Sequence, residues 1–233
     1  MKVRAVVFDL FNTLTSPVHE VDFRASVRAM GLAAGVNPDA FTRGWFELWR
    51  QLLDGTLGTT EAGVRRVCKA MRAEVAQARI ARAVDVRLEF SRQALRPRGD
   101  AVATLRHVRR MGVRTALLSN CTADVPDLWP SLPYAELIDE PLFSCVEGLV
   151  KPDSGLYQRA CERLGVGPSA CVYVGDGDDQ ELTGAARAGM RAVLIRTPEA
   201  TAASSLSERG SWSGEAIDSL SEIPGLIRTG NAT

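Results

Sequence analysis

Lysine is scarce in this sequence. Only Lys2, Lys69 and Lys151 occur among its 28 basic residues, and the other 25 are arginines. A GC-rich coding sequence favours arginine in this way, so a retained lysine raises the question of what an arginine could not do there. The 28 basic residues are matched by 28 acidic ones. This zero net charge excludes a general electrostatic attraction to nucleic acid or to an anionic membrane.

The chain also lacks a long apolar run. No run reaches the ~18 residues that a membrane span requires, and the first apolar stretch ends at Asp9, which is too short for a signal peptide. The five cysteines are an odd number without close pairing, which favours buried thiols over a disulfide framework or a zinc site. We therefore expect a cytoplasmic protein that binds neither membranes nor nucleic acid. No coiled-coil repeat is readable, so the oligomeric state stays open.

Alternating strands and helices are the main pattern of the sequence. With 233 residues, of which 45% are hydrophobic, the chain suffices for one large domain or for a domain that carries a smaller insert. The β-branched run over residues 3–8 predicts a buried parallel strand. Further strands are predicted at 113–118, 171–174, 192–195 and near 217, and helices at 101–111, 156–164, 181–188 and up to 227, with a loop over 198–214. This order predicts an α/β fold, a Rossmann-like parallel sheet with helices on both faces.

Residues from about 21 to 95 differ in character from the rest. Apolar residues such as Phe41, Trp45 and Leu52 recur there at helical spacing, and no strand pattern is visible. The segments 37–38 and 59–61 are typical helix starts. We predict an α/β core domain formed by residues 1–16 and 96–233, interrupted by an all-helical cap domain over residues 17–95. The insert follows the tip of the first strand and would cover it.

Four polar residues follow predicted strands or lie in the next loop: Asp9, Ser119, Lys151 and Asp176. Each has a simple structural alternative, because Asp9 and Ser119 could cap helices or turns, Lys151 could be a solvated charge, and Asp176 could serve a turn. In an open parallel sheet, however, these positions converge on one crevice. Their joint placement therefore predicts a functional site.

The segments around these residues carry a specific resemblance. Residues 6–14 (VVFDLFNTL), 117–120 (LLSN), 148–153 (GLVKPD) and 174–185 (VGDGDDQELTGA) resemble, in order, the four motifs of the haloacid dehalogenase superfamily of hydrolases. The helical insert lies where a subgroup of this superfamily carries its cap domain. The resemblance covers residues 3–15 and about 97–225.

The resemblance implies catalytic roles for four residues. Asp9 would be a nucleophile that forms a covalent aspartyl intermediate. Thr13 and Ser119 would donate hydrogen bonds to the anionic group under attack. Lys151 would pair with both Asp9 and the anion, because a compact ammonium can bridge two oxygens where a planar guanidinium suits one carboxylate better. Binding of the small anionic substrate is assigned to Asn12, Ser119, Asn120 and Lys151.

The resemblance also implies a metal cofactor. Asp9, Asp176 and the backbone carbonyl of Phe11 would bind Mg²⁺, which prefers hard oxygen ligands and retained waters. Glu181 would hold one of those waters, although most family members carry an aspartate at that point. Because the side chain of Glu181 is longer than that of aspartate, the geometry of its contact with the metal-bound water stays open.

Phe11 departs from the family's phosphatase pattern. Phosphatases of this superfamily usually carry a second aspartate there, which protonates the leaving oxygen, and such assistance is worth ~10²–10⁴-fold in rate. Three functions remain open. The first is a Mg²⁺-dependent phosphatase, whose substrate would have a good leaving group or whose cap would supply the acid. The others are a 2-haloacid dehalogenase and a non-catalytic ligand-binding domain. Dehalogenases share an aromatic residue at this position and counterparts of Lys151 and Tyr157, but they replace the acidic metal ligand. Asp176 therefore favours a metal, and with it phosphate chemistry.

The sequence gives less indication of which cap residues contact the substrate. Trp45, Trp49, Arg43 and Arg50 are candidates to face the crevice, although tryptophans four residues apart on a helix usually pack in a core. The arginines could equally be solvated. Cys121 could line the pocket or be a buried thiol, and His19 could supply the missing proton or be a hinge residue at the surface.

Overall fold

A parallel sheet of six strands forms the centre of the molecule. The computed structural model describes residues 2–196 and 207–229. The strands of the described part are β1 (Ala5–Phe8), β2 (Arg114–Ser119), β3 (Glu140–Phe143), β4 (Cys171–Gly175), β5 (Arg191–Ile195) and β6 (Glu215–Ile217). Their order is β3-β2-β1-β4-β5-β6, and every neighbouring pair is parallel. The predicted α/β fold with a Rossmann-like parallel sheet is confirmed.

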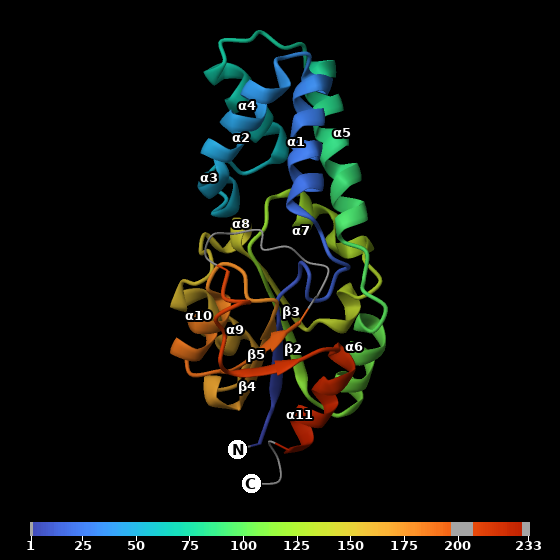
Figure 1. Cartoon of the computed structure of the whole chain (residues 1–233), viewed down its shortest axis with the longest axis vertical. Coiled ribbons are helices and arrows are strands. Elements are labelled where there is room, and N and C mark those ends of the chain that lie inside the picture. The colour runs from blue at the N-terminus through green and yellow to red at the C-terminus, as the bar shows by residue number, and fades with distance from the viewer. Residues whose placement is uncertain (1, 197–206, 230–233) are drawn as a thin grey trace.

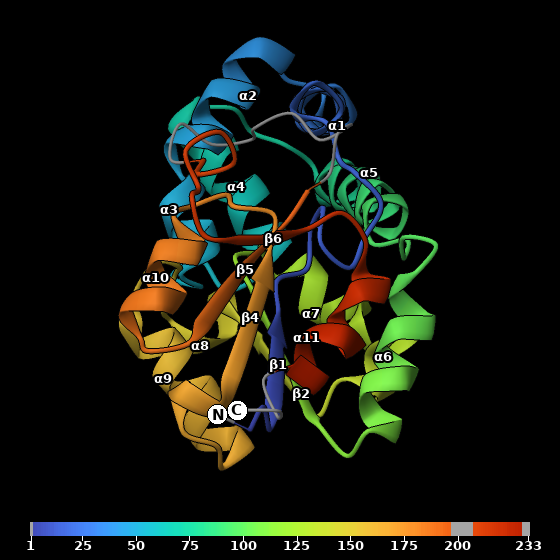
Figure 2. The ribbon, with the colours of Figure 1, turned by 60° about the horizontal axis from the view of Figure 1, so that its bottom comes forward.

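Helices cover both faces of the sheet, as Figure 2 shows. They are α6 (Ala101–Arg110), α7 (Asp124–Leu128), α8 (Ser144–Glu147), α9 (Ser154–Leu164), α10 (Glu181–Arg187) and α11 (Ile223–Thr229), with single 3₁₀ turns at Trp129–Ser131, Ala135–Leu137, Pro168–Ala170 and Leu220–Glu222. Alternate residues of β1 point to opposite faces. Val6 and Phe8 pack in the core under α6 and α11, whereas Ala5 and Val7 pack in the core under α9 and α10.

A second group of helices stands at one end of the sheet (Figure 1). These cap helices are α1 (Glu20–Ala34), α2 (Pro38–Glu47), α3 (Trp49–Leu53), α4 (Thr60–Ala70) and α5 (Gln77–Ala94). The two predicted helix starts are confirmed, because the Asn37 side chain accepts from Ala40 N at 2.9 Å and the Thr59 side chain accepts from Ala62 N at 3.1 Å. The group has its own apolar core around the fully buried Trp45.

The chain leaves the sheet for the cap helices and returns at the same place. Thr15 and Pro97 form an isolated antiparallel bridge. Beside it, Ser16 N donates to the Arg96 carbonyl and Arg98 N donates to the Leu14 carbonyl, each at 3.0 Å. The predicted domain boundaries, at 16/17 and 95/96, lie next to this pairing and stay a prediction.

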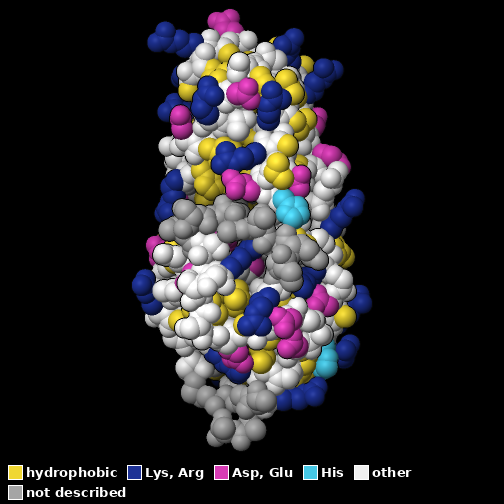
Figure 3. Space-filling model, viewed as in Figure 1, with side chains coloured by type: hydrophobic (Ala, Val, Ile, Leu, Met, Phe, Trp, Pro, Cys, Tyr) yellow, Lys and Arg dark blue, Asp and Glu magenta, His cyan; other side chains and the backbone are white. Residues whose placement is uncertain are grey.

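The sequence pattern did not reveal every element. β3, α7 and α8 were not predicted, and part of the predicted loop over 198–214 lies outside the described residues. Within the described part, no helix is both long and apolar enough to cross a membrane. On the face shown in Figure 3, basic and acidic side chains are interspersed, in keeping with the balanced charge of the sequence.

Candidate active site

Three of the four predicted strand-end residues line one cavity, and all four are buried. Asp9 follows β1, Lys151 precedes α9 and Asp176 follows β4, and each lines the cavity, whereas Ser119 is the last residue of β2. The cavity has a volume of about 590 Å³ and lies between the carboxyl ends of the strands and the cap helices. This is the place where open parallel sheets bind ligands.

Lys151 bridges two carboxylates at the base of the cavity. Its Nζ atom lies 2.6 Å from Asp9 Oδ1 and 2.6 Å from Glu181 Oε2, and it donates to the Tyr173 hydroxyl at 3.4 Å. Burial acts to lower the pKa of Lys151, but the two carboxylates outweigh burial and hold that pKa well above its ordinary value. The group is therefore an ammonium ion in a site of net negative charge.

Three carboxylates crowd together around this ammonium. Oxygen atoms of Asp9, Asp176 and Glu181 all lie within 4.8 Å of one another. Burial and the charge of Glu181 raise the pKa of Asp9 to about 7, and burial with the charges of Glu181 and Asp9 raises that of Asp176 well above its ordinary value. Lys151 pairs with Asp9 and Glu181 and Arg209 pairs with Asp176, so two cations face three buried carboxyl groups. Buried oxygen ligands with excess negative charge fit a hard divalent cation.

Glu181 is fixed by four contacts. Its Oε2 atom binds Lys151 and accepts from the Tyr173 hydroxyl at 2.7 Å, while Oε1 accepts from Gly177 N at 2.9 Å. Its backbone carbonyl accepts from the Tyr157 hydroxyl at 3.0 Å. The implied role of Glu181 in holding a metal-bound water stays a prediction. The sequence analysis did not foresee its direct contact with Lys151.

Arg209 is a residue near the site that the sequence analysis missed. Its guanidinium forms an ion pair with Asp176 Oδ2. The neighbouring Glu208 accepts hydrogen bonds from Leu182 N at 2.9 Å and Thr183 N at 3.2 Å, at the first turn of α10. These contacts tie the segment around residue 209 to the site. It follows a Ser- and Ala-rich stretch, so no pattern in the sequence pointed to it.

Two of the four buried hydroxyls that lack a hydrogen-bond partner within the described residues belong to the motif segments identified in the sequence. They are Thr13 Oγ1, in the loop after Asp9, and Ser119 Oγ. An unsatisfied buried polar group costs about 1–3 kcal/mol, so each one needs an explanation, and a bound ligand is one. Both residues are those for which the resemblance implies hydrogen bonds to the substrate anion.

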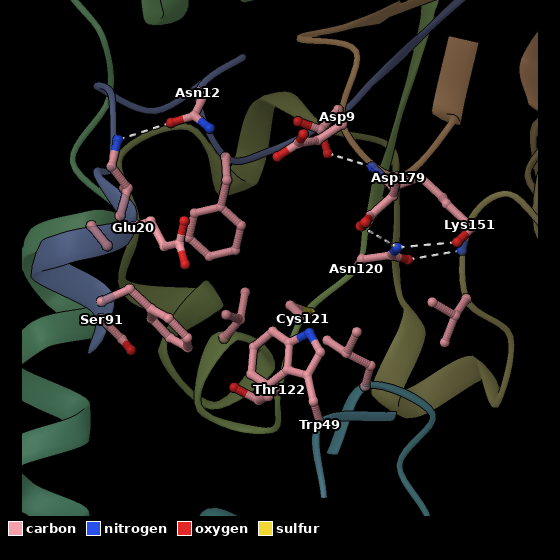
Figure 4. Close-up of a pocket in the computed structure, with 18 of the residues that line it drawn as sticks. Asp9, Asn12, Glu20, Trp49, Ser91, Asn120, Cys121, Thr122, Lys151 and Asp179 are labelled. Carbon is pink, nitrogen blue, oxygen red and sulfur yellow. Dashed lines mark hydrogen bonds and ion pairs between the residues drawn. The ribbon is translucent and has the colours of Figure 1, made fainter. Parts of the chain in front are cut away.

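The two predicted substrate-binding asparagines also line the cavity. Asn120 accepts from Lys151 N at 2.8 Å and donates to Asp179 Oδ2 at 2.8 Å, so it lies between these residues (Figure 4). Asn12 accepts from Val18 N at 2.8 Å, and its own φ is 58°. Both side chains thus shape the loops around the site.

The cap helices complete the cavity. Trp49 and Arg50 line it, as proposed for the cap candidates, and Figure 4 shows Trp49 across the cavity from Asp9. Trp45 lies in the core of the cap helices, and Arg43 is not among the lining residues. Cys121 and His19 both line the cavity, and Cys121 is at the same time a buried thiol.

The profile of the haloacid dehalogenase-like hydrolases matches residues 3–189. The chain belongs to this hydrolase family. The motif resemblance is thereby confirmed at the level of the family, and residues from all four motif segments line the cavity.

Relatives of this hydrolase include two kinds of enzyme. It is 31% identical over 204 residues to a glyceraldehyde 3-phosphate phosphatase of Methanopyrus kandleri, covering 83% of this chain and 84% of the relative. It is 28% identical over 207 residues to the (S)-2-haloacid dehalogenase 4A of Burkholderia cepacia, covering 83% of both. The crystal structure of a 2-haloacid dehalogenase from Pseudomonas syringae superposes with a TM-score of 0.71 at 24% identity, covering 97% of this chain and 99% of the other. That superposition supports the fold alone.

Proposed function

We propose that this hydrolase is a cytoplasmic, Mg²⁺-dependent phosphatase that acts on a small phosphorylated metabolite, with Asp9 as its nucleophile. The observation that carries this proposal is the cluster of Asp9, Asp176 and Glu181, three buried carboxyl groups within 4.8 Å of one another that face only two cations, Lys151 and Arg209, among the described residues. The phosphatase relative, at 31% identity over most of both chains, supports the same chemistry.

The carboxylates of Asp9 and Asp176, with the backbone carbonyl of Phe11, would hold the ion. When bound, Mg²⁺ would neutralise charge on the phosphoryl oxygens and orient the group for attack. Because Asp9 and Asp176 both have raised pKa values in the protein alone, a cation at this position favours their ionised forms.

The protein's own residues would then carry the reaction. A carboxylate oxygen of Asp9 attacks phosphorus, the bond from phosphorus to the ester oxygen breaks, and the leaving oxygen departs with its electron pair. Lys151 holds the Asp9 carboxylate and neutralises a phosphoryl oxygen, while Thr13 and Ser119 donate hydrogen bonds to the others. Water then cleaves the aspartyl phosphate, which releases inorganic phosphate and restores Asp9.

Phe11 supports one alternative, a 2-haloacid dehalogenase. In that reaction Asp9 would displace halide from carbon, halide would leave without a proton, and no metal would be needed. The relative from Burkholderia cepacia carries the name of this activity. Tyr157 does not add to the alternative, because its ring is fully buried and its hydroxyl is bonded to the Glu181 carbonyl.

Two assays separate these functions. Phosphate release from a panel of phosphorylated metabolites, with Mg²⁺ and with EDTA, tests the first, and chloride release from 2-chloropropionate in EDTA tests the second. We expect Mg²⁺-dependent phosphate release that Asp9→Asn abolishes, while Asp22→Asn, at an exposed position of α1, retains it. Chloride release that persists in EDTA would replace the proposal with the dehalogenase. Absence of both activities, with no beryllium fluoride adduct at Asp9, would indicate a non-catalytic binding domain.

A further inference from the structure

Aromatic side chains are concentrated at the active-site cavity. The sequence has only 14 aromatic residues, and five of them line this cavity: Phe11, Phe23, Phe46, Trp49 and Phe90. None of the five is fully buried. Four come from four different cap helices, and Phe11 comes from the loop that carries the nucleophile.

The four rings from the cap helices form one continuous surface. The ring centre of Phe23 lies 5.3 Å from that of Trp49, 5.7 Å from that of Phe46 and 5.9 Å from that of Phe90. Rings left partly open to water forgo part of their hydrophobic stabilisation. A flat apolar ligand would recover it, with edge-to-face or offset stacking as the preferred contact.

The charges at this end of the cavity are already matched. Arg87 lies over Phe23, with 4.9 Å to the ring centre, and is paired with Asp124 at 3.2 Å. Arg24 lies over Phe46 at 4.6 Å and is paired with Glu20 at 2.7 Å. The cavity therefore has an anion-binding end at Lys151 and an aromatic end without excess charge.

Phe11 independently restricts the leaving group. Its phenyl ring lines the cavity two residues after Asp9 and cannot donate a proton to the departing oxygen. An oxygen that leaves as an anion does so faster when its conjugate acid is strong. A phenol has a pKa of about 10, several units below that of an aliphatic alcohol.

We infer that the substrate of this site is an aryl phosphate, in which an aromatic ring is joined directly to the ester oxygen. The ring would lie against the aromatic surface, and the phosphoryl group would lie between Asp9 and Lys151. Asp9 displaces the phenolate at phosphorus, the bond from phosphorus to the phenolic oxygen breaks, and the phenolate takes a proton from solvent. This inference rests on the proposed phosphatase function, because a dehalogenase would not use the phosphoryl group.

A set of three substrates tests the inference with the whole Mg²⁺-loaded protein. We expect kcat/KM for 1-naphthyl phosphate to exceed that for cyclohexyl phosphate, which is apolar but has a poor leaving group, by at least about 100-fold. Acetyl phosphate has a good leaving group without a ring and reports on the phosphoryl site. If acetyl phosphate is hydrolysed but 1-naphthyl phosphate is not preferred over cyclohexyl phosphate, the inference is overturned and the proposed function stands. If none of these three substrates and no member of the metabolite panel is hydrolysed, both the inference and the proposed function are overturned.

Variants of the aromatic surface provide the second arm. Trp49→Ala and Phe90→Leu should each lower the ratio of kcat/KM for 1-naphthyl phosphate to that for acetyl phosphate, by about tenfold for Trp49→Ala. Leu32→Ala removes an exposed apolar side chain from α1, away from the cavity, and should leave the ratio unchanged. Thermal unfolding of each variant identifies any loss of fold. An unchanged ratio in folded Trp49→Ala and Phe90→Leu proteins would contradict an aryl-binding role for this surface.

Discussion

Lys151 Nζ lies 2.6 Å from Glu181 Oε2, so the ammonium that contacts Asp9 is also held by a second buried carboxylate. Both residues are almost fully inaccessible to solvent. The lysine is thus fixed between two anions, and its position depends on both.

Lys151→Arg should lower kcat by at least about 100-fold. A guanidinium is planar and larger than an ammonium, so it cannot occupy the same point between the two carboxylates. The charge is kept, and we therefore expect the fold to survive. Turnover of the best substrate, measured beside circular dichroism and thermal unfolding, checks this. Near-normal turnover in the folded variant would show that Lys151 does not have the proposed role.

Glu181→Gln should lower kcat by about 10–100-fold, a typical effect when a partner that orients a catalytic group is removed. The amide has no charge with which to hold Lys151. If Glu181 acts mainly through Lys151, this variant should weaken Mg²⁺ binding less than Asp176→Asn does. Isothermal titration with Mg²⁺ and steady-state kinetics on both variants make the comparison. Equal losses of Mg²⁺ affinity would instead assign Glu181 to the metal.

Arg209→Ala should strengthen Mg²⁺ binding, by about threefold or more. In the protein alone the Arg209 guanidinium is paired with Asp176, a proposed metal ligand, so the ion has to compete with it. Titration calorimetry gives the dissociation constant directly. Arg196→Ala breaks an exposed ion pair with Asp218 and is the matched control. Weaker Mg²⁺ binding in Arg209→Ala would mean that the arginine supports the metal site.

Thr13→Val should reduce kcat/KM by about 10²–10³-fold, the usual cost of losing one donor to a developing anion. Stability should not fall, because the Thr13 hydroxyl is buried without a partner among the described residues. Thr60→Val is the control. Thr60 Oγ1 is likewise buried without a partner among the described residues, but it lies at the start of α4 and does not line the cavity. Denaturant unfolding and kinetics on both variants separate the roles. A Thr13→Val protein with full activity would contradict the assigned hydrogen bond.

Asp124 should make the stability sensitive to acid. Burial acts to raise its pKa, but Arg87, Ser91 and Thr122 outweigh burial and hold that pKa below the ordinary 3.8. A carboxyl with a lowered pKa in the folded state contributes stability above the unfolded pKa, and loses this contribution as the pH falls through the folded pKa. Asp124→Asn should therefore be less stable than the natural protein at pH 7, by about 3–5 kcal/mol because Arg87 loses its buried partner.

Urea unfolding of the two proteins between pH 7 and pH 3 tests this expectation. The difference in free energy of unfolding should narrow toward low pH. A difference that is constant or grows as the pH falls would contradict the assigned role of Asp124.

The sheet was predictable because its central strands are buried on both faces. Runs such as that over residues 3–8 carry few polar residues, and β-branched apolar runs of this length are typical of buried parallel strands. β3 was missed because it is a short edge strand that contains Pro141, which ordinarily argues against a strand. The cap helices were predictable from their spacing and from their capping residues Asn37 and Thr59.

The site was predictable only in part, for a physical reason. The strand-end rule places Asp9, Ser119, Lys151 and Asp176 together, because parallel strands bring their carboxyl ends to one edge. Contacts such as those of Glu181 with Lys151 and of Arg209 with Asp176 depend on side-chain geometry between segments about 30 residues apart. No local pattern encodes such contacts. The same holds for the aromatic surface, whose members come from separate helices.

The pairing of Thr15 with Pro97 has a consequence for how such a protein can change over time. The two segments that connect the cap helices to the sheet lie side by side. The sheet therefore requires only that the inserted segment begin and end at neighbouring points. The number, length and side chains of the helices between them can vary while β1, which leads to Asp9, stays in register with β2 and β4. The chemistry and the choice of substrate are therefore free to diverge separately.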